Sequence, residues 1–207
     1  GDERREIIVI NPGSTWSKLA RYRSEPETRE PVEVRTEQIP STGGTGRDLR
    51  DELAERFAEV ERFASEGAAP AIVVARGGMV KPVTAGSYGV DEVMIDDLLS
   101  CRFGRHASNL GAPLAARLAE AYGCAAMIAD PVGVDEFPDV ARVSGWKGIE
   151  RRSFSHALNL RACARRTARD LGIGFAASSL IGAHLGGGIS VAAMVGGRIV
   201  DVNNSNE

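Results

Sequence analysis

Short apolar runs alternate with amphipathic segments along the chain, and this pattern predicts an α/β protein. Runs rich in β-branched residues that end at Gly, Pro, Asn or Asp predict buried strands. They cover residues 7–10, 18–23, 32–38, 71–74, 125–129, 180–184, 189–194 and 198–202. Apolar residues spaced by three and four predict helices at residues 49–64, 92–99, 109–122 and 154–171. This order of strands and helices favours an α/β fold over an all-α or all-β fold.

Three segments carry a finer pattern. In residues 32–38, valine and threonine alternate with glutamate and arginine, so we expect one face of this strand to be wet. Pro113 fits the helix at residues 109–122 only if it lies in the first turn. The last helix has an arginine-rich side, and we expect its residues 161–169 to be solvated. Its inward side is formed by Ala157, Leu160, Ala164, Ala168 and Leu171.

Composition excludes several classes of protein. With 207 residues and 43% apolar residues, the chain can bury a core. Its net charge of −3 argues against a basic nucleic-acid surface. The three cysteines lie far apart, which excludes a disulfide framework or a cysteine zinc site and suits a reducing cytoplasm. The apolar runs are far shorter than a membrane span. We therefore expect a cytoplasmic protein without nucleic-acid or membrane partners.

The chain has 24 glycines, and four of them lie in two polar loops that follow strands. Residues 11–15 (NPGST) lead to Lys18, and such a turn can present backbone N–H groups, hydroxyls and a lysine to a phosphate. An ordinary hairpin turn explains the same residues. Residues 184–188 (HLGGG) allow the close approach of a ligand or form a tight corner. One loop in each half suggests a bound nucleotide, although neither matches a P-loop or Rossmann motif.

Four further residues at element ends are candidates for chemistry. Asp130 can hold Mg²⁺ or act as a nucleophile, or it can cap a turn. Arg76 can grip a carboxylate with its planar fork, or form a surface ion pair. His106 and His156 are single histidines, which are more often structural than catalytic, and no motif typical of a histidine zinc site occurs.

Taken together, the motifs resemble the butyrate kinases, within the acetate kinase group of the actin/Hsp70/sugar-kinase superfamily. The likeness runs in order from about Ile7 to Asn204. The segments that carry it are residues 10–18 (INPGSTWSK), 75–78 (ARGG), 104–112 (GRHASNLGA), 130–137 (DPVGVDEF), 141–145 (ARVSG), 150–159 (ERRSFSHALN), 183–190 (AHLGGGIS) and 197–204 (GRIVDVNN).

The resemblance implies a fold and a reaction. The fold is a ribonuclease H-like, actin-like ATPase lobe at residues 1–145, with a mixed sheet and flanking helices. Residues 146–207 then form the incomplete beginning of a second, similar lobe. The reaction is reversible transfer of the ATP γ-phosphate to a short-chain carboxylate such as butyrate, with Mg²⁺, to give an acyl phosphate and ADP. The resemblance also implies a homo-oligomer.

The resemblance assigns roles to individual residues. Asp130, His156 and Arg76 are the expected catalytic residues, and Arg76, His106 and Asn109 the expected substrate-binding residues. Asn11 and Asp130 are expected at the metal. The residues expected to bind nucleotide or phosphate are Asn11, Gly13, Ser14, Thr15, Lys18, His184, Gly186, Gly187 and Gly188.

Two departures from the family pattern affect these expectations. Trp16 replaces a small hydroxyl residue in the first loop, where its indole either crowds the phosphate or packs outward. Family members continue past Asn204 with the adenosine pocket, so we expect little or no turnover from this 207-residue chain. The alternative is a non-catalytic phosphate- or nucleotide-binding remnant, or half of a split protein. The length of the carboxylate stays open.

Overall fold

The structure, a computed structural model, describes residues 5–25, 31–41, 47–186 and 188–203. The chain divides into two compact units. The first comprises Gly1–Val80 and Ser87–Ala129, and the second comprises Lys81–Gly86 and Asp130–Glu207. Residues 130–145, which the sequence assigned to the first lobe, therefore pack with the second unit.

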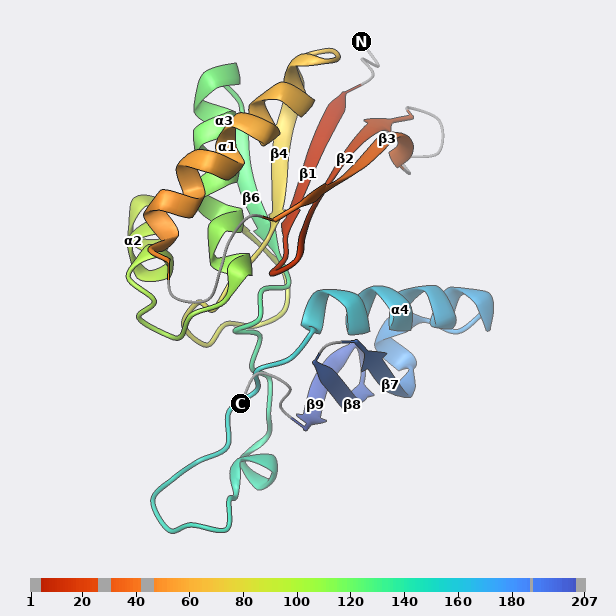
Figure 1. Cartoon of the computed structure of the whole chain (residues 1–207). Helices are drawn as coiled ribbons and strands as arrows, with labels where there is room; N and C mark the ends of the chain where they lie inside the picture. Colours follow the sequence, from red (N-terminus) through yellow and green to blue (C-terminus); the bar gives the residue numbers. More distant parts are fainter. Residues whose placement is uncertain (1–4, 26–30, 42–46, 187, 204–207) are drawn as a thin grey trace. The chain divides into compact units, whose positions relative to one another are not determined.

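The first unit is built on a mixed six-stranded sheet in the order β3-β2-β1-β4-β6-β5. Strand β1 pairs antiparallel with β2 and parallel with β4. The strands are β1 (Glu6–Pro12), β2 (Trp16–Ser24), β3 (Pro31–Pro40), β4 (Pro70–Arg76), β5 (Ser87–Gly89) and β6 (Ala125–Ala129). The helices are α1 (Leu49–Ser65), α2 (Glu92–Leu99), the 3₁₀ helix η1 (Ala107–Leu110) and α3 (Gly111–Tyr122). Helices α1 and α3 cover one face of this sheet (Figure 1).

Local signals in the sequence fix these helices. Helix α1 begins after Asp48, whose side chain accepts a hydrogen bond from the Arg50 N–H at 2.8 Å. Pro113 lies in the first turn of α3, as predicted, and Gly123 ends this helix in the left-handed conformation at φ 65°. The side chains that meet in the core are fully buried: Ile8, Ile10, Phe63, Val73, Leu118 and Ile128.

Strand β3 has one wet face, as predicted, and this is the face that carries the valines. Its valines and charged residues alternate as predicted, but Val32 and Val34 form the outer face and are 51% and 46% exposed. Arg35 and Glu37 lie on the face that meets α1, where the Arg35 guanidinium lies 4.8 Å from the Phe63 ring centroid. Ion pairs with α1 and aliphatic stems therefore let the charged face be the covered one.

The second unit is a three-stranded antiparallel meander with one long helix. The strands are β7 (Ser179–Leu185), β8 (Ile189–Val195) and β9 (Arg198–Val202), in that order. The helices are α4 (Ala157–Asp170) and the 3₁₀ helices η2 (Asp139–Arg142) and η3 (Phe175–Ala177). Leu160 and Ala164 of α4 pack against Ala192, Met194 and Ile199 of the sheet. The outer face carries exposed apolar side chains: Ile181, Leu185, Ile189, Val191 and Val195.

Helix α4 differs from its prediction at both ends and on one side. It begins at Ala157 rather than Phe154, and Leu171 is 64% exposed because the helix ends at Asp170. Arg161, expected on a solvated face, is only 6% exposed. In the part of the chain that the structure describes, no helix has both the length and the apolar character needed to cross a bilayer.

Candidate active site

The candidate residues fall into two groups, one in each unit. The first unit holds the loop of residues 11–18, Arg76, His106 and Asn109. The second unit holds Asp130, His156, His184, Gly186 and Gly188. Gly187, predicted to bind phosphate, lies outside the described residues.

The loop between β1 and β2 is a tight turn with an exposed tip. Asn11 and Lys18 face each other across the antiparallel pair that leads into it. The Gly13 N–H donates to the Trp16 carbonyl at 2.9 Å, and a Cβ on Gly13 would lie 2.7 Å from that oxygen. Only glycine fits there without a shift of the backbone. Ser14 follows Gly13 and is exposed, so the turn presents its backbone outward.

Asn11 offers an oxygen ligand beside this turn. Its side-chain Oδ1 is buried and makes no hydrogen bond with the described residues. A buried, unsatisfied acceptor is costly unless a further group binds it. Mg²⁺ prefers oxygen ligands and is usually held by one or two protein oxygens together with substrate phosphates. The described residues contain no group of three or more His, Cys, Asp or Glu side chains, so Asn11 fits a phosphate-bound Mg²⁺ better than a dedicated metal site.

Trp16, which departs from the family pattern, is the first residue of β2. Its side chain is exposed and 47% of its surface is accessible. The indole therefore packs outward, and of the two expected positions this one leaves the turn open.

Arg76 and His106 are a charged guanidinium and an imidazole whose protonation that charge opposes. Burial alone lowers the pKa of Arg76, and no described acidic side chain forms an ion pair with it. Burial and, to a smaller extent, the charge of Arg76 lower the pKa of His106. The His106 Nδ1 accepts a hydrogen bond from the Ser108 N–H at 3.1 Å, which places the ring proton on Nε2. A half-buried guanidinium without an acidic partner is suited to an anionic ligand.

Both polar atoms of the Asn109 side chain form hydrogen bonds with backbone groups. Its Oδ1 accepts from the Met79 N–H at 3.0 Å, and its Nδ2 donates to the carbonyls of Leu98 and Gly104 at 3.1 and 2.9 Å. A Cβ on Gly78 would collide with it. Asn109 therefore fixes the segment that carries His106, and its contact with substrate stays a prediction.

Asp130 is held on both carboxylate oxygens. The Gly86 N–H donates to Oδ1 at 2.8 Å, and Arg161 Nε donates to Oδ2 at 3.0 Å. The Asp130 N–H returns a hydrogen bond to the Gly86 carbonyl, and the residue adopts φ 36°, which is rare for a residue other than glycine. Each oxygen keeps a second lone pair, so an ion or water can still be bound.

His156 and His184 stack face to face, with ring centroids 3.8 Å apart and an interplanar angle of 10°. His156 Nδ1 lies 3.0 Å from Ser190 Oγ. Asn159 Nδ2 donates to His184 Nδ1 at 3.1 Å, and a Cβ on Gly186 would lie 3.0 Å from His184 Nε2. The structure therefore brings these two predicted residues together, with the glycine loop against the second ring.

Sequence reasoning missed two arginines that hold these loops. Arg56 reaches from α1 to the Gly13 carbonyl, and Arg161 reaches from α4 to Asp130. Helical spacing could have revealed that these arginines are buried. Arg56 follows the buried Glu52 by four residues, and Arg161 follows the buried Ala157 by four, so each lies on the buried side of its helix. An arginine on the inward stripe of a helix therefore marked a buried hydrogen-bond donor in both units.

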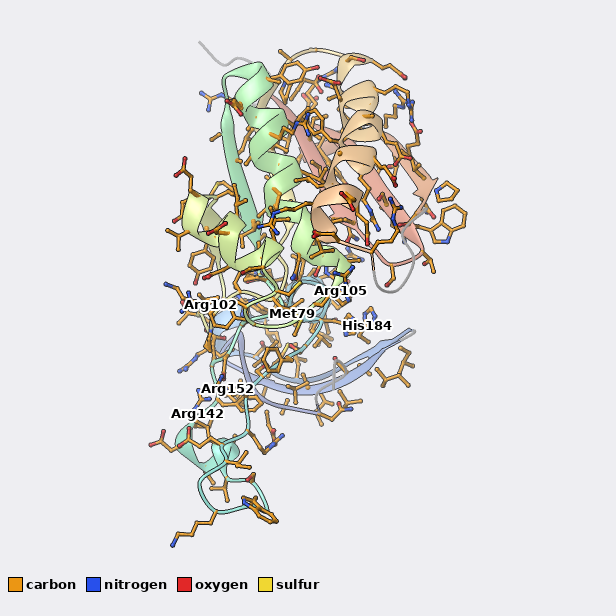
Figure 2. All side chains as sticks on the ribbon, turned by 60° about the vertical axis from the view of Figure 1, so that its left-hand side comes forward. Met79, Arg102, Arg105, Arg142, Arg152 and His184 are labelled. Carbon is orange, nitrogen blue, oxygen red and sulfur yellow. The ribbon has the colours of Figure 1, made fainter. Side chains whose placement is uncertain are left out.

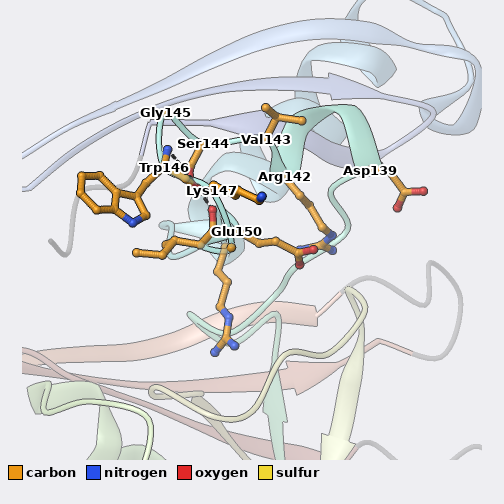
Figure 3. Close-up of a pocket in the computed structure, with 11 residues that line it drawn as sticks. Asp139, Arg142, Val143, Ser144, Gly145, Trp146, Lys147 and Glu150 are labelled. Atoms are coloured by element: carbon orange, nitrogen blue, oxygen red, sulfur yellow. Dashed lines mark hydrogen bonds between the residues drawn. The ribbon is translucent and has the colours of Figure 1, made fainter.

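The hollow in Figure 3 contains none of the predicted residues. Asp139, residues 142–150 and Arg152 line it. Figure 3 shows Trp146 pointing away from this loop, and the side chain is 72% exposed. Since the predicted chemistry lies elsewhere, this hollow is not the candidate site.

Comparison with known proteins identifies the relatives of the chain. No family model matches it. A probable butyrate kinase of Coprothermobacter proteolyticus is 44% identical over 205 residues, which are 97% of this chain and 57% of that protein. A probable butyrate kinase of Enterococcus faecalis is 45% identical over 204 residues, which are 96% of this chain and 55% of that protein. The resemblance to the butyrate kinases is confirmed. The chain spans a little more than half the length of these butyrate kinases.

Solved structures confirm the expected fold. The acetate kinase of Porphyromonas gingivalis matches with a TM-score of 0.62 and 15% identity, over 97% of this chain and 57% of that one. A propionate kinase from Francisella tularensis matches with a TM-score of 0.60 and 15% identity, over the same shares. The mixed sheet with flanking helices is therefore the actin-like ATPase fold of these kinases. These comparisons assign no role to an individual residue of this chain, so the roles of single residues rest on the geometry described above.

Proposed function

We propose that the chain forms part of a carboxylate kinase that transfers the ATP γ-phosphate reversibly to butyrate or a similar short-chain acid. The similarity to butyrate kinases supports this reaction. In such transfer the nucleophile is a carboxylate, which is already ionised at pH 7, so the protein has to position groups and neutralise charge. The residues of both units suit that task.

The first unit would hold the phosphates and the acid. The turn Gly13–Thr15, with Asn11 and Lys18, would bind phosphate, and Arg76 and His106 would bind the carboxylate. Asn109 would keep His106 in place through its backbone contacts. The Asn11 Oδ1, orphaned in a buried position, supports this residue as a ligand of Mg²⁺. When bound, Mg²⁺ would neutralise charge on the phosphate oxygens.

The second unit would act on the transferring phosphoryl group and the ATP phosphates. His156 would donate a hydrogen bond to the phosphoryl oxygens as charge develops. Asp130 would hold Mg²⁺ or the substrate through its remaining lone pairs, while Arg161 and Gly86 fix its position. His184 and the glycines at 186–188 would bind the ATP phosphates.

The observation that carries this proposal is Arg76. It is a half-buried guanidinium whose pKa burial lowers and to which no described acidic residue is paired. Desolvating a charge is costly unless an opposite charge compensates it. A substrate carboxylate supplies that charge, with a geometry that matches the guanidinium fork.

Butyrate binding tests this proposal directly on the chain. Sodium butyrate should shift the NMR signals of the His106 ring in a saturable way. Arg76→Gln should lose this response, whereas Arg102→Gln, which changes an arginine on an exposed ion pair, should keep it. The same saturable response in Arg76→Gln, or none in the unaltered chain, would refute the proposal.

Trapping of acyl phosphate tests the reaction. Incubation with ATP, Mg²⁺, butyrate and hydroxylamine converts acyl phosphate into a hydroxamate that can be measured by its iron complex. We expect little product from these 207 residues alone, because they span 57% of a related kinase. Rapid formation of hydroxamate would show that these residues suffice.

A homo-oligomer is the second part of the proposal, and the alternative of a split protein predicts association with another chain. The exposed Ile181, Leu185 and Val191 on the outer face of β7 and β8 favour association of either kind. Light scattering during size-exclusion chromatography should give a mass above 22.0 kDa. A monomer at high concentration would contradict the homo-oligomer.

A further inference from the structure

A buried arginine of helix α1 forms hydrogen bonds with the turn between β1 and β2. Arg56 is 5% exposed, and its Nη1 donates to the Gly13 carbonyl at 3.0 Å and to Ser17 Oγ at 3.1 Å. Its Nη2 donates to Ser41 Oγ and to Glu52 Oε2, the latter at 3.3 Å. One guanidinium therefore holds both ends of the turn from inside the unit.

The bond to Gly13 also determines where the next amide points. The structure contains no cis peptide among its described residues, so the Gly13 carbonyl and the Ser14 N–H point in opposite directions across one planar peptide. Because Arg56 holds the carbonyl inward, the Ser14 N–H points outward. This N–H makes no hydrogen bond with the described residues. An outward backbone N–H of this kind can donate to an anion, and Lys18 lies on β2 after the turn.

A buried carboxylate extends the contact to the segment that carries His106. Glu52 is 5% exposed, and its Oε1 accepts from Arg105 Nη2 at 3.4 Å. Arg105, labelled in Figure 2, also donates to the carbonyl of Arg47, just before α1. Arg56, Glu52 and Arg105 thus form a row of alternating charge within the first unit.

We propose that Arg56 is a positioning residue that orients the Ser14 amide for phosphate, and that Glu52 and Arg105 couple this turn to the His106 segment. The proposal deepens the proposed function and rests on it. A buried arginine is costly to desolvate, and a turn at the surface could hydrogen-bond to water instead. One of its terminal nitrogens, Nη1, donates to both the Gly13 carbonyl and the Ser17 hydroxyl, and such a paired contact fixes the geometry of the turn.

Trp16 reports on the turn, since its carbonyl accepts the Gly13 N–H and its side chain is exposed. The chain has two tryptophans, so Trp146→Phe leaves Trp16 as the single fluorophore. In this background, Mg·ATP and pyrophosphate are titrated, and acrylamide quenching measures how accessible Trp16 is. The variants are Arg56→Lys, which keeps the charge and loses the fork, and Arg62→Lys on the exposed side of the same helix.

Arg56→Lys should stay folded by circular dichroism, raise the dissociation constant for Mg·ATP about tenfold, and increase quenching of Trp16. Arg62→Lys should change neither value. Equal dissociation constants and equal quenching in the two variants would overturn the proposal. If the parent chain itself does not respond to Mg·ATP, the proposed function fails, while the quenching comparison still decides whether Arg56 orders the turn.

A second variant decides the matter if Arg56→Lys unfolds. Arg105 has a side chain that is 42% exposed, so Arg105→Gln should leave the fold intact. It removes one of the two cations on Glu52 and should raise the Mg·ATP dissociation constant about threefold. Unchanged binding and quenching in this folded variant would overturn the coupling between the two segments.

Discussion

In each unit a buried arginine on a helix donates a hydrogen bond to the backbone of a glycine turn. The two arginines differ in the carboxylate with which each forms an ion pair. Arg56 donates to the Gly13 carbonyl and pairs with Glu52 on its own helix. Arg161 donates to the Gly197 carbonyl and pairs with Asp130, which lies 31 positions earlier in the chain. Arg56 therefore forms its ion pair with a residue outside the candidate site, whereas Arg161 forms its ion pair with a candidate residue. The same side chain can support a site from behind or form part of it.

Among these substitutions, the removal of Arg161 should lower the free energy of unfolding the most. Arg161→Gln leaves the Asp130 carboxylate with only the Gly86 N–H, in a position where its side chain is 14% exposed. Breaking a buried ion pair on one side costs about 3–5 kcal/mol, and we expect a loss of unfolding free energy near the lower end. Urea denaturation measures it. Arg166→Gln on the exposed side of α4 should stay within about 0.5 kcal/mol.

Removing Arg56 should cost less, because Glu52 keeps Arg105 as a partner. We expect Arg56→Gln to lower the unfolding free energy by about 2 kcal/mol, from lost hydrogen bonds of a charged donor. Urea denaturation of this variant beside Arg161→Gln sharpens the comparison. A loss for Arg56→Gln that equals or exceeds that of Arg161→Gln would mean that the partner on the same helix makes no difference.

The glycines of the two loops should differ in the opposite direction, with the larger loss of stability in the first unit. Gly13→Ala places a Cβ 2.7 Å from a backbone carbonyl, so the turn has to move, at a cost of about 1–2 kcal/mol. Gly186→Ala places it 3.0 Å from the His184 ring, which can rotate away. Thermal unfolding of both variants tests this. A larger loss of melting temperature for Gly186→Ala would contradict the comparison.

Arg76 extends the comparison to an arginine that forms no ion pair with a described carboxylate. Its effect on the free energy of unfolding, which acts through His106, should be the smallest. Burial and the charge of Arg76 lower the pKa of His106 from its ordinary value of 6.5. A histidine that resists protonation when folded contributes stability above pH 6.5, and this is lost as the pH falls towards the lowered pKa. The slope is at most about 1.4 kcal/mol per pH unit. NMR titration should give a higher His106 pKa in Arg76→Gln, and an unchanged pKa would refute the link.

The elements were largely predictable because their signals are local. Asp48 and Gly123 mark helix ends, and Ala125–Ala129 and Arg198–Val202 were predicted with the bounds that the structure has. The alternation of residues in β3 did not decide which face of the strand is covered. Whether Val32 or Arg35 of β3 is covered depends on which side of the sheet α1 packs against, and the alternation of residues does not contain that information.

The sequence marks the candidate residues more clearly than the residues that support them. The glycine loops and histidines stand out because their residue types are unusual at strand ends, and His156 and His184 do meet. Arg56 and Arg161 do not stand out, since arginines on helices are mostly solvated. Only their place on the inward stripe distinguishes them, between Leu49 and Val60 in α1 and between Ala157 and Ala164 in α4.

The apolar outer face of β7 and β8 has a thermodynamic consequence. Contact through Ile189 and Val195 would release water from hydrocarbon, so association should carry a negative heat-capacity change. Sulfate salts should then strengthen self-association and cooling should weaken it, the reverse of what an interface of ion pairs would do in salt.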